Sequence, residues 1–337
     1  MKEISVKIAN ASVIAAAMVV GIHTAGMEIG TFKLGSAIWW WLALGMYGMF
    51  QIAVPFFFLC SGYFIAGHIG EDGWYRRECR KRVRSLLIPY ISWSLLYFAL
   101  ESLVSCASGL VHGRSIVVNM DIRSWVRTLG LSPFEYPRLW PLWYVRTLIV
   151  FVILCPVLKR MVNVIGVIGL FVLATCLEIH FKATKIDFLL QKGLCLFGLF
   201  FFMFGMLLQH RAICLPKRGH IVALMTGCCI VVVSACLRRW YGVSFFPRTL
   251  CATLLIFGLW RFMPTRAFPD WITNSSFPVF VLHPFFLYLW CCILPCHIST
   301  ISMWVLKWLF CIGGSIIVAV TLRHNCPKMA TFVFGGR

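Results

Sequence analysis

Long apolar runs recur along almost the whole of this 337-residue chain. A helix that crosses the hydrocarbon core of a membrane needs about 20 mainly apolar residues. Only 12% of the residues are charged, roughly half the share of a soluble domain, so lipid must solvate most of the surface. Ten runs approach the spanning length, and they lie near 8–26, 38–66, 86–106, 142–157, 162–178, 188–208, 220–237, 248–262, 276–294 and 302–321.

The sequence therefore predicts an all-α fold, a polytopic membrane helix bundle of about ten transmembrane helices that forms one domain over residues 1–337. Run 38–66 is longer than one span needs, so we expect it to tilt or to contain a break. Run 8–26 follows Lys2 and Lys7, as the apolar part of a signal peptide would. Because further spans follow it, we expect it to remain as the first helix.

The formal net charge of +20 does not indicate a nucleic-acid partner, because the charges follow the membrane topology. With a cytoplasmic N-terminus and ten spans, more than half of the 31 Lys and Arg residues fall on the cytoplasmic side. That bias is the positive-inside rule. It predicts that both termini are cytoplasmic and that the inner surface attracts anionic lipid or an anionic ligand.

A strongly basic connection is expected at 68–85, on the cytoplasmic side. It could be a solvated face that touches lipid headgroups. It could also grip the phosphates of a nucleotide-bearing donor such as coenzyme A, because guanidinium groups bind phosphate well. The candidate ligand-binding residues there are Arg77, Arg80, Arg82 and Arg84.

Two histidines lie inside apolar runs, where ionisable groups are costly and often functional. His23 follows Lys7 by 16 residues, about 24 Å along a helix, which places it toward the outer side. A neutral imidazole there could take a proton from a hydroxyl, or it could only hold neighbouring helices together. His283, counted from residue 276, falls in the cytoplasmic half, so the two histidines are not expected to share a depth.

Three charged residues at helix positions could assist His23. Glu101 and Glu178 end the third and fifth runs at the depth inferred for His23, where a carboxylate could orient the imidazole or simply face water. Arg146 near the start of the fourth run could hold an anionic ligand or extend its side chain outward to the interface.

The long external connection at 107–141 ends in aromatic residues, among them Trp140 and Trp143. They could form an interfacial belt or stack on a sugar ring. The sixteen cysteines lie mostly in apolar runs, with no pairs at zinc spacing. Cysteines of this kind behave as small hydrophobic residues, so no metal is predicted.

Five segments in order resemble the acyltransferase 3 family of integral membrane O-acyltransferases. They are MVVGIH with His23 in the first helix, VPFFFLCSGYF (Val54 to Phe64), RKRVRSLLIPYISW (Arg80 to Trp93), LWYVRTLIVFVILCP (Leu142 to Pro156), and SFPVFVLHPFF (Ser276 to Phe286). Each segment alone is a weak signal. Their order and spacing over about residues 10 to 290 make the resemblance specific.

The resemblance implies transfer of an acetyl group from cytoplasmic acetyl-CoA, or another acyl-CoA, to a hydroxyl of a cell-surface or lipid-linked carbohydrate. It also implies a multi-pass protein of a bacterial inner membrane with lipid around it. In this reading His23 is the general base, Arg146, Glu101 and Glu178 assist it, and the basic segment holds the donor. The candidate substrate-binding residues are Ser61, Tyr63, Trp140, Trp143 and His283.

One departure from the family pattern leaves alternatives open. The family commonly carries arginine eleven residues before the first-helix histidine, on the same helix face, whereas this chain has Ser12. Either Arg146 or Arg82 supplies the missing charge, or the chain is a non-catalytic member. A transporter or flippase for a lipid-linked sugar would also account for buried histidine and arginine among proline-containing spans.

Overall fold

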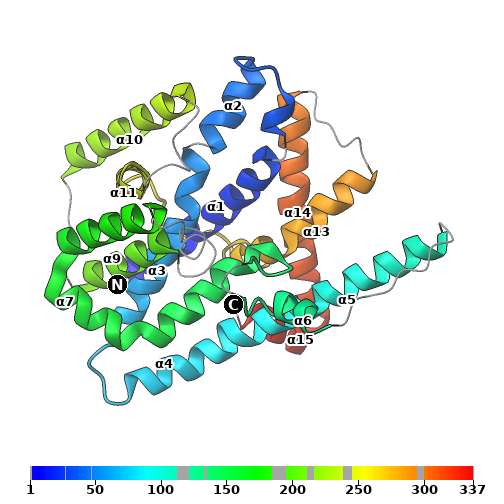
Figure 1. Ribbon diagram of the computed structural model, residues 1–337, viewed down its shortest axis with the longest axis horizontal. Coiled ribbons are helices and arrows are strands. Elements are labelled where there is room, and N and C mark those ends of the chain that lie inside the picture. The colour runs from blue at the N-terminus through cyan, green and yellow to red at the C-terminus, as the bar shows by residue number, and fades with distance from the viewer. Residues whose placement is uncertain are drawn as a thin grey trace.

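The computed structural model describes residues 2–26, 28–46, 48–111, 121–132, 135–183, 195–210, 216–237, 245–293 and 300–336. All secondary structure over these residues is helical, which confirms the predicted all-α membrane bundle (Figure 1). Six helical segments in these ranges are long and apolar enough to cross a membrane, and shorter apolar helices lie at 168–177, 196–209 and 249–260. The predicted count of about ten spans is not confirmed.

The main helices are α1 (Lys2–Gly26), α2 (Ala37–Met46), α3 (Ala53–Ala66), α4 (Trp74–Arg82), α5 (Ile88–Val111), α6 (Ile122–Thr128), α7 (Trp143–Ala183), α9 (Leu196–His210), α10 (Lys217–Leu237), α11 (Phe245–Trp260), α12 (Asp270–Thr273), α13 (Ser276–Ile293), α14 (Ile301–Asn325) and α15 (Pro327–Phe334). Short turns of helix, η1 (Ile29–Thr31), η2 (Met49–Ile52), η3 (Val83–Leu87) and η4 (Trp140–Leu142), connect several of them.

Helix α1 is the centre of the bundle and packs against α2, α3, α13 and α14 (Figure 1). Its small residues allow this, because Ala15, Ala16 and Val20 are buried against several neighbours at once. The helix that carries His23 is therefore enclosed by four neighbouring helices.

The predicted break in run 38–66 is confirmed. Helix α2 ends at Met46, η2 follows, and α3 begins at Ala53. The Phe50 ring fills the space that side chains would occupy at Gly21 of α1 and Gly45 of α2, where an added Cβ would lie 2.9 and 2.5 Å from it. The break therefore places the Phe50 ring between α1 and α2.

The basic segment predicted as a connection is mostly helix, which corrects that expectation. Only residues 67–73 form turns, and α4 then continues through the π-turn η3 into α5. Arginine, lysine and glutamate are good helix formers, so this polar sequence can extend the spanning helix beyond the apolar region.

The boundary between the fourth and fifth runs also differs from the prediction. The helix continues through Lys159 and Arg160 and breaks at Gly166, whose φ is 66°. A left-handed conformation of this kind is favourable for glycine and costly for other residues. Backbone conformation, rather than the pair of charges, sets this boundary.

Helices α3 and α9 make the closest helix contact. An added Cβ on Gly62 would lie 1.9 Å from the carbonyl oxygen of Phe202, and one on Gly205 would lie 2.0 Å from that of Leu59. Small residues of this kind let spanning helices approach each other closely, which is a main source of association in lipid.

We expect Gly62→Ala to push α3 and α9 apart and to cost about 1–3 kcal/mol, as overpacking generally does. Gly313→Ala is the matched control, because nothing lies within 4 Å of a Cβ there. Thermal unfolding in detergent measures both variants. Equal stabilities would mean that the α3–α9 contact is looser than described.

Candidate functional site

Three aromatic side chains from distant parts of the sequence meet at the end of α1. The His23 ring lies 3.8 Å from the Trp140 ring and 5.4 Å from the His283 ring, measured between centroids. Trp140 and His283 are also 5.4 Å apart. The prediction that the two histidines differ in depth is therefore wrong, and their rings are nearly parallel, with an interplanar angle of 17°.

Asn10 explains why counting residues misplaced His283. Its buried side-chain amide donates to the carbonyl oxygens of Pro264 and Arg266, at 3.1 and 2.9 Å, and its oxygen accepts from the Phe268 amide at 3.0 Å. The connection before α13 is thus held against α1 well inside its N-terminal end. Helix α13 therefore starts further along the axis of α1 than Lys2 does. The seven residues from Ser276 are enough to bring His283 level with His23.

The His283 ring has a defined protonation pattern. Its Nδ1 lies 3.2 Å from the carbonyl oxygen of Val279, which can only accept, so Nδ1 carries the proton of the neutral ring. Its Nε2 is then an acceptor, and this atom is buried without a hydrogen-bond partner in the described part of the chain. A buried polar atom of this kind suits a hydroxyl donated by a ligand.

His23 differs from its neighbour in exposure. Its side chain is half-buried, and that of His283 is fully buried. Trp140, from η4, is also half-buried and supplies an aromatic face beside the imidazole. The arrangement combines a reachable imidazole, a buried acceptor and a flat apolar surface, which are suited to proton transfer at a bound hydroxyl.

Ser12 and Arg146, one of the two candidates for the missing positive charge, both bind backbone carbonyl oxygens. The Ser12 hydroxyl donates to the carbonyl of Ile8 in its own helix, at 2.7 Å. Arg146 places one guanidinium nitrogen within 2.8, 2.8 and 3.1 Å of the carbonyl oxygens of Gly130, Ser132 and Glu135. Arg146 therefore folds the segment before η4 onto α7.

The structure describes one of the two carboxylates predicted to orient His23, and this one is paired with an arginine. Glu101 accepts from Arg138 at 3.0 Å, with 46% of its side chain exposed. This ion pair joins α5 to the segment that leads into η4. The Glu178 side chain lies outside the described residues, and its role stays a prediction.

The predicted donor-binding arginines divide into two kinds. Arg77 donates to Glu71, and this hydrogen bond, with a second from His68, lowers the pKa of the Glu71 carboxyl. Arg82 donates to the buried Glu78 at 2.6 Å. Arg80 and Arg84 are exposed, and no carboxylate pairs with them among the described residues.

The other predicted substrate-binding residues lie apart from the histidines. The Trp143 ring packs 6.4 Å from the Phe58 ring of α3, and no ring contact joins it to either histidine among the described residues. Helix α3 runs antiparallel to α1, because Phe50 packs on Gly21 while Phe56 lies near Ala11. Ser61 and Tyr63 are therefore nearer the N-terminal end of α1 than the end that carries His23.

A buried ion pair was missed by sequence reasoning. Glu28, just beyond α1, accepts from Lys307 of α14 at 2.9 Å, and their side chains are 3% and 0% exposed. The Trp308 indole also donates to the Ala17 carbonyl at 2.8 Å. A lysine within an apolar run was the available signal, because such a charge requires a partner. The pair fastens the His23 end of α1 to α14.

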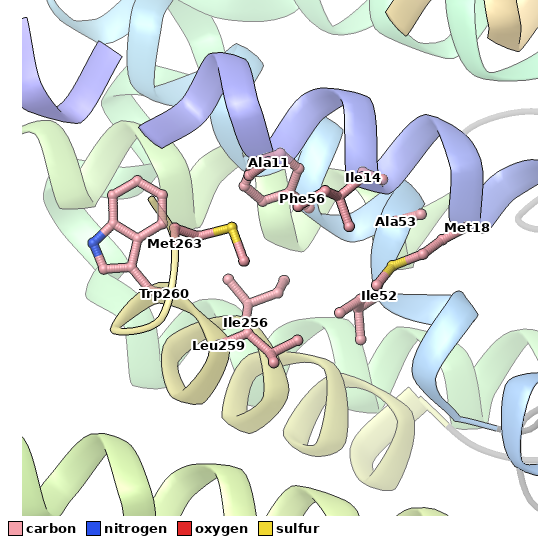
Figure 2. Close-up of a pocket in the computed structure, with 11 residues that line it drawn as sticks. Ala11, Ile14, Met18, Ile52, Ala53, Phe56, Ile256, Leu259, Trp260 and Met263 are labelled. Atoms are coloured by element: carbon pink, nitrogen blue, oxygen red, sulfur yellow. The ribbon is translucent and has the colours of Figure 1, made fainter. Parts of the chain in front are cut away.

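An apolar cavity lies along residues 11–18 of α1 (Figure 2). Residues of α1, α3 and α11 line it, and it encloses about 50 Å³. Figure 2 shows hydrocarbon and methionine sulfur facing the space, including Ile14, Met18 and Met263. This lining excludes charged groups, and neither histidine belongs to it. Among the described residues, no group of three His, Cys, Asp or Glu side chains could hold a metal ion.

The fold and the site together define a multi-pass membrane protein with paired imidazoles inside its bundle. A family profile described as "Acyltransferase domain" matches residues 12–324. The chain therefore belongs to the acyltransferase 3 family, and membrane acyltransferase is its class. No curated protein matches the chain, and no solved structure does.

We expect Lys307→Met to destabilise the protein by about 3–5 kcal/mol, because it leaves the Glu28 charge buried and unpaired. Adding Glu28→Gln should recover most of that loss. Unfolding of the single and double variants in detergent tests this coupling. A single variant as stable as the parent would show that water reaches Glu28.

Proposed function

We propose that this protein is a membrane O-acetyltransferase that moves an acetyl group from acetyl-CoA to a hydroxyl of a cell-surface or lipid-linked carbohydrate. The meeting of His23, His283 and Trp140 is the observation that carries this proposal. Family membership supports the transfer of an acyl group. The carbohydrate acceptor is supported by a flat indole face beside a proton acceptor, because sugar rings stack on such faces.

In this proposal His23 acts as the general base, because it is the reachable imidazole of the pair. The acceptor hydroxyl loses its proton to His23 as its oxygen attacks the thioester carbonyl. The C–O bond forms, the tetrahedral intermediate collapses, and the C–S bond breaks. The proton on His23 then passes to the departing thiolate of coenzyme A, so charge and atoms balance.

His283 would position the acceptor rather than exchange its proton. Its unpartnered Nε2 can accept a hydrogen bond from a second hydroxyl of the sugar. Two hydroxyls held at two imidazoles fix both the position and the orientation of the ring, and such alignment contributes strongly to rate. Trp143, Ser61 and Tyr63 are further from this point, and we assign them to the approach of substrate rather than to its reacting atoms.

The orientation of the protein in the membrane is a second part of the proposal. The charge bias supports cytoplasmic termini and a bacterial inner-membrane location, with the basic end of α4 facing the cytoplasm. Donor phosphates would bind at that end, whereas His23 lies at the opposite end of α1. The acetylated arm of the donor would therefore have to extend into the bundle to reach the base.

We expect His23→Gln to lower acetyl transfer by about 10²–10⁴-fold while the protein stays folded, because glutamine keeps hydrogen bonding but cannot take the proton. His283→Gln should mainly raise the KM for the acceptor. His324→Gln is the matched control, since His324 is exposed at the end of α14. Transfer from radiolabelled acetyl-CoA to membrane glycans is the measurement. Wild-type transfer by the His23 variant would assign the base elsewhere.

The proposed orientation predicts that a reporter at the C-terminus and one inserted after Arg138 lie on opposite sides of the membrane. A phosphatase and fluorescent-protein pair reads out each position. Both reporters active on one side would overturn the orientation, and with it the cytoplasmic placement of the basic helix.

A further inference from the structure

The apolar cavity beside α1 has a cationic side chain at one end. The α1 residues that line it recur every three or four positions and so share one helix face: Ala11, Ile14, Ala15 and Met18. Lys7 lies four residues before Ala11, on that same face. This face of α1 is therefore apolar along the cavity and positively charged just before it.

An aromatic ring of the cavity wall holds Lys7 in place. The Lys7 Nζ lies 5.7 Å from the centroid of the Trp260 ring, and Trp260 lines the cavity from α11. Lys7 also pairs with Glu3, but at 3.6 Å and with 67% of the Glu3 side chain exposed. An ion pair exposed in this way contributes little free energy. Lys7 therefore keeps most of its attraction for another anion.

Two arginines follow the same end of α11. Arg261 comes directly after the helix, and Arg266 is held against α1 because its backbone carbonyl accepts from Asn10 at 2.9 Å. Both arginines are exposed, and no carboxylate pairs with either one among the described residues. A cleft of about 510 Å³ lies along residues 264–269, directly after the cavity residue Met263. The fold thus adds two cations and space for a polar group at the Lys7 end of the cavity.

The cavity is a groove with a buried floor and a partly exposed rim. Ala15 and Phe56 in its floor are buried, whereas Met18 and Leu259 at its rim are half-buried. Figure 2 shows the space between α1 and α11, with Met18 on one side and Leu259 on the other. Residues 11–18 lie within the first segment long and apolar enough to span the membrane. The solvent at the rim is therefore lipid hydrocarbon.

We propose that this groove binds one acyl chain of an anionic phospholipid, with the headgroup phosphate at Lys7, Arg261 and Arg266. The volume of about 50 Å³ suits a short length of a single chain. Cations at the edge of a membrane span attract anionic headgroups, whereas a zwitterionic lipid has no net charge to offer them. Neither histidine lines the groove, so the proposal does not rest on acyl transfer.

The test titrates phosphatidylglycerol, or phosphatidylcholine with the same chains, into the full-length protein in neutral detergent and counts bound lipid by native mass spectrometry. The parent protein should bind phosphatidylglycerol more tightly. Lys7→Gln/Arg266→Gln should weaken that binding by about 30-fold, about fivefold for each cation near the headgroup. Arg160→Gln/Lys328→Gln is the matched control, because it removes the same two charges from residues outside the groove. Equal losses in the two double variants, or equal affinities of the parent for the two lipids, would overturn the site.

Ala11→Leu tests the position of the chain. Leucine would occupy the floor of the groove, so the lipid chain could enter only by overpacking it, and phosphatidylglycerol binding should weaken by about tenfold or more. Ala9→Leu is the control, since Ala9 belongs to the same helix but does not line the groove. Thermal unfolding without added lipid shows whether each variant is folded. Unchanged binding by folded Ala11→Leu would overturn the proposal, and if this variant unfolds, the charge variants decide.

Discussion

The three hydrogen bonds of Asn10 are the interaction on which the rest of the site depends. In a membrane no water competes for a buried amide, so each bond it makes must come from protein. Asn10 satisfies its donors and acceptor with the backbone of one short connection, between α11 and α13. This anchor sets where α13 begins, and through α13 it sets the height of His283 beside His23.

A second constraint acts at the other end of α1. The buried pair of Glu28 and Lys307 and the Trp308–Ala17 hydrogen bond fasten the end of α1 to α14. Helix α1 is thus held by polar contacts on both sides of its apolar middle. Lipid tails are as apolar as the side chains that face them, so the hydrophobic effect does not select which helices pack together. Polar contacts and close backbone packing therefore specify the arrangement of the helices.

Apolar periodicity and length were sufficient to predict a helical membrane bundle, because the need for about 20 apolar residues per span is a strict physical requirement. The break near residue 48 was also predictable from excess length. Helix boundaries at Gly166 and at residues 67–73 were not, since they depend on backbone conformation and on polar residues that remain helical.

The site was predictable in its members and not in its geometry. His23 and His283 were selected because charge-bearing groups are rare in apolar helices. Their contact was missed because counting assumes that every span starts at one level. The sequence leaves Trp140 open between an interfacial belt and a face that stacks on a sugar ring. The Glu28–Lys307 pair involves residues more than two hundred positions apart, which no local pattern connects.

The π-turn at Val83–Leu87 has a consequence for the direction in which the arginines point. A π-turn accommodates one residue more than the regular α-helix, and one residue corresponds to about 100° of rotation about the axis. The phase of α4 is thereby offset from that of α5, whose Trp93 faces α15. One inserted residue is therefore enough to rotate the basic side chains of α4 toward Gly335 and Gly336, which follow α15.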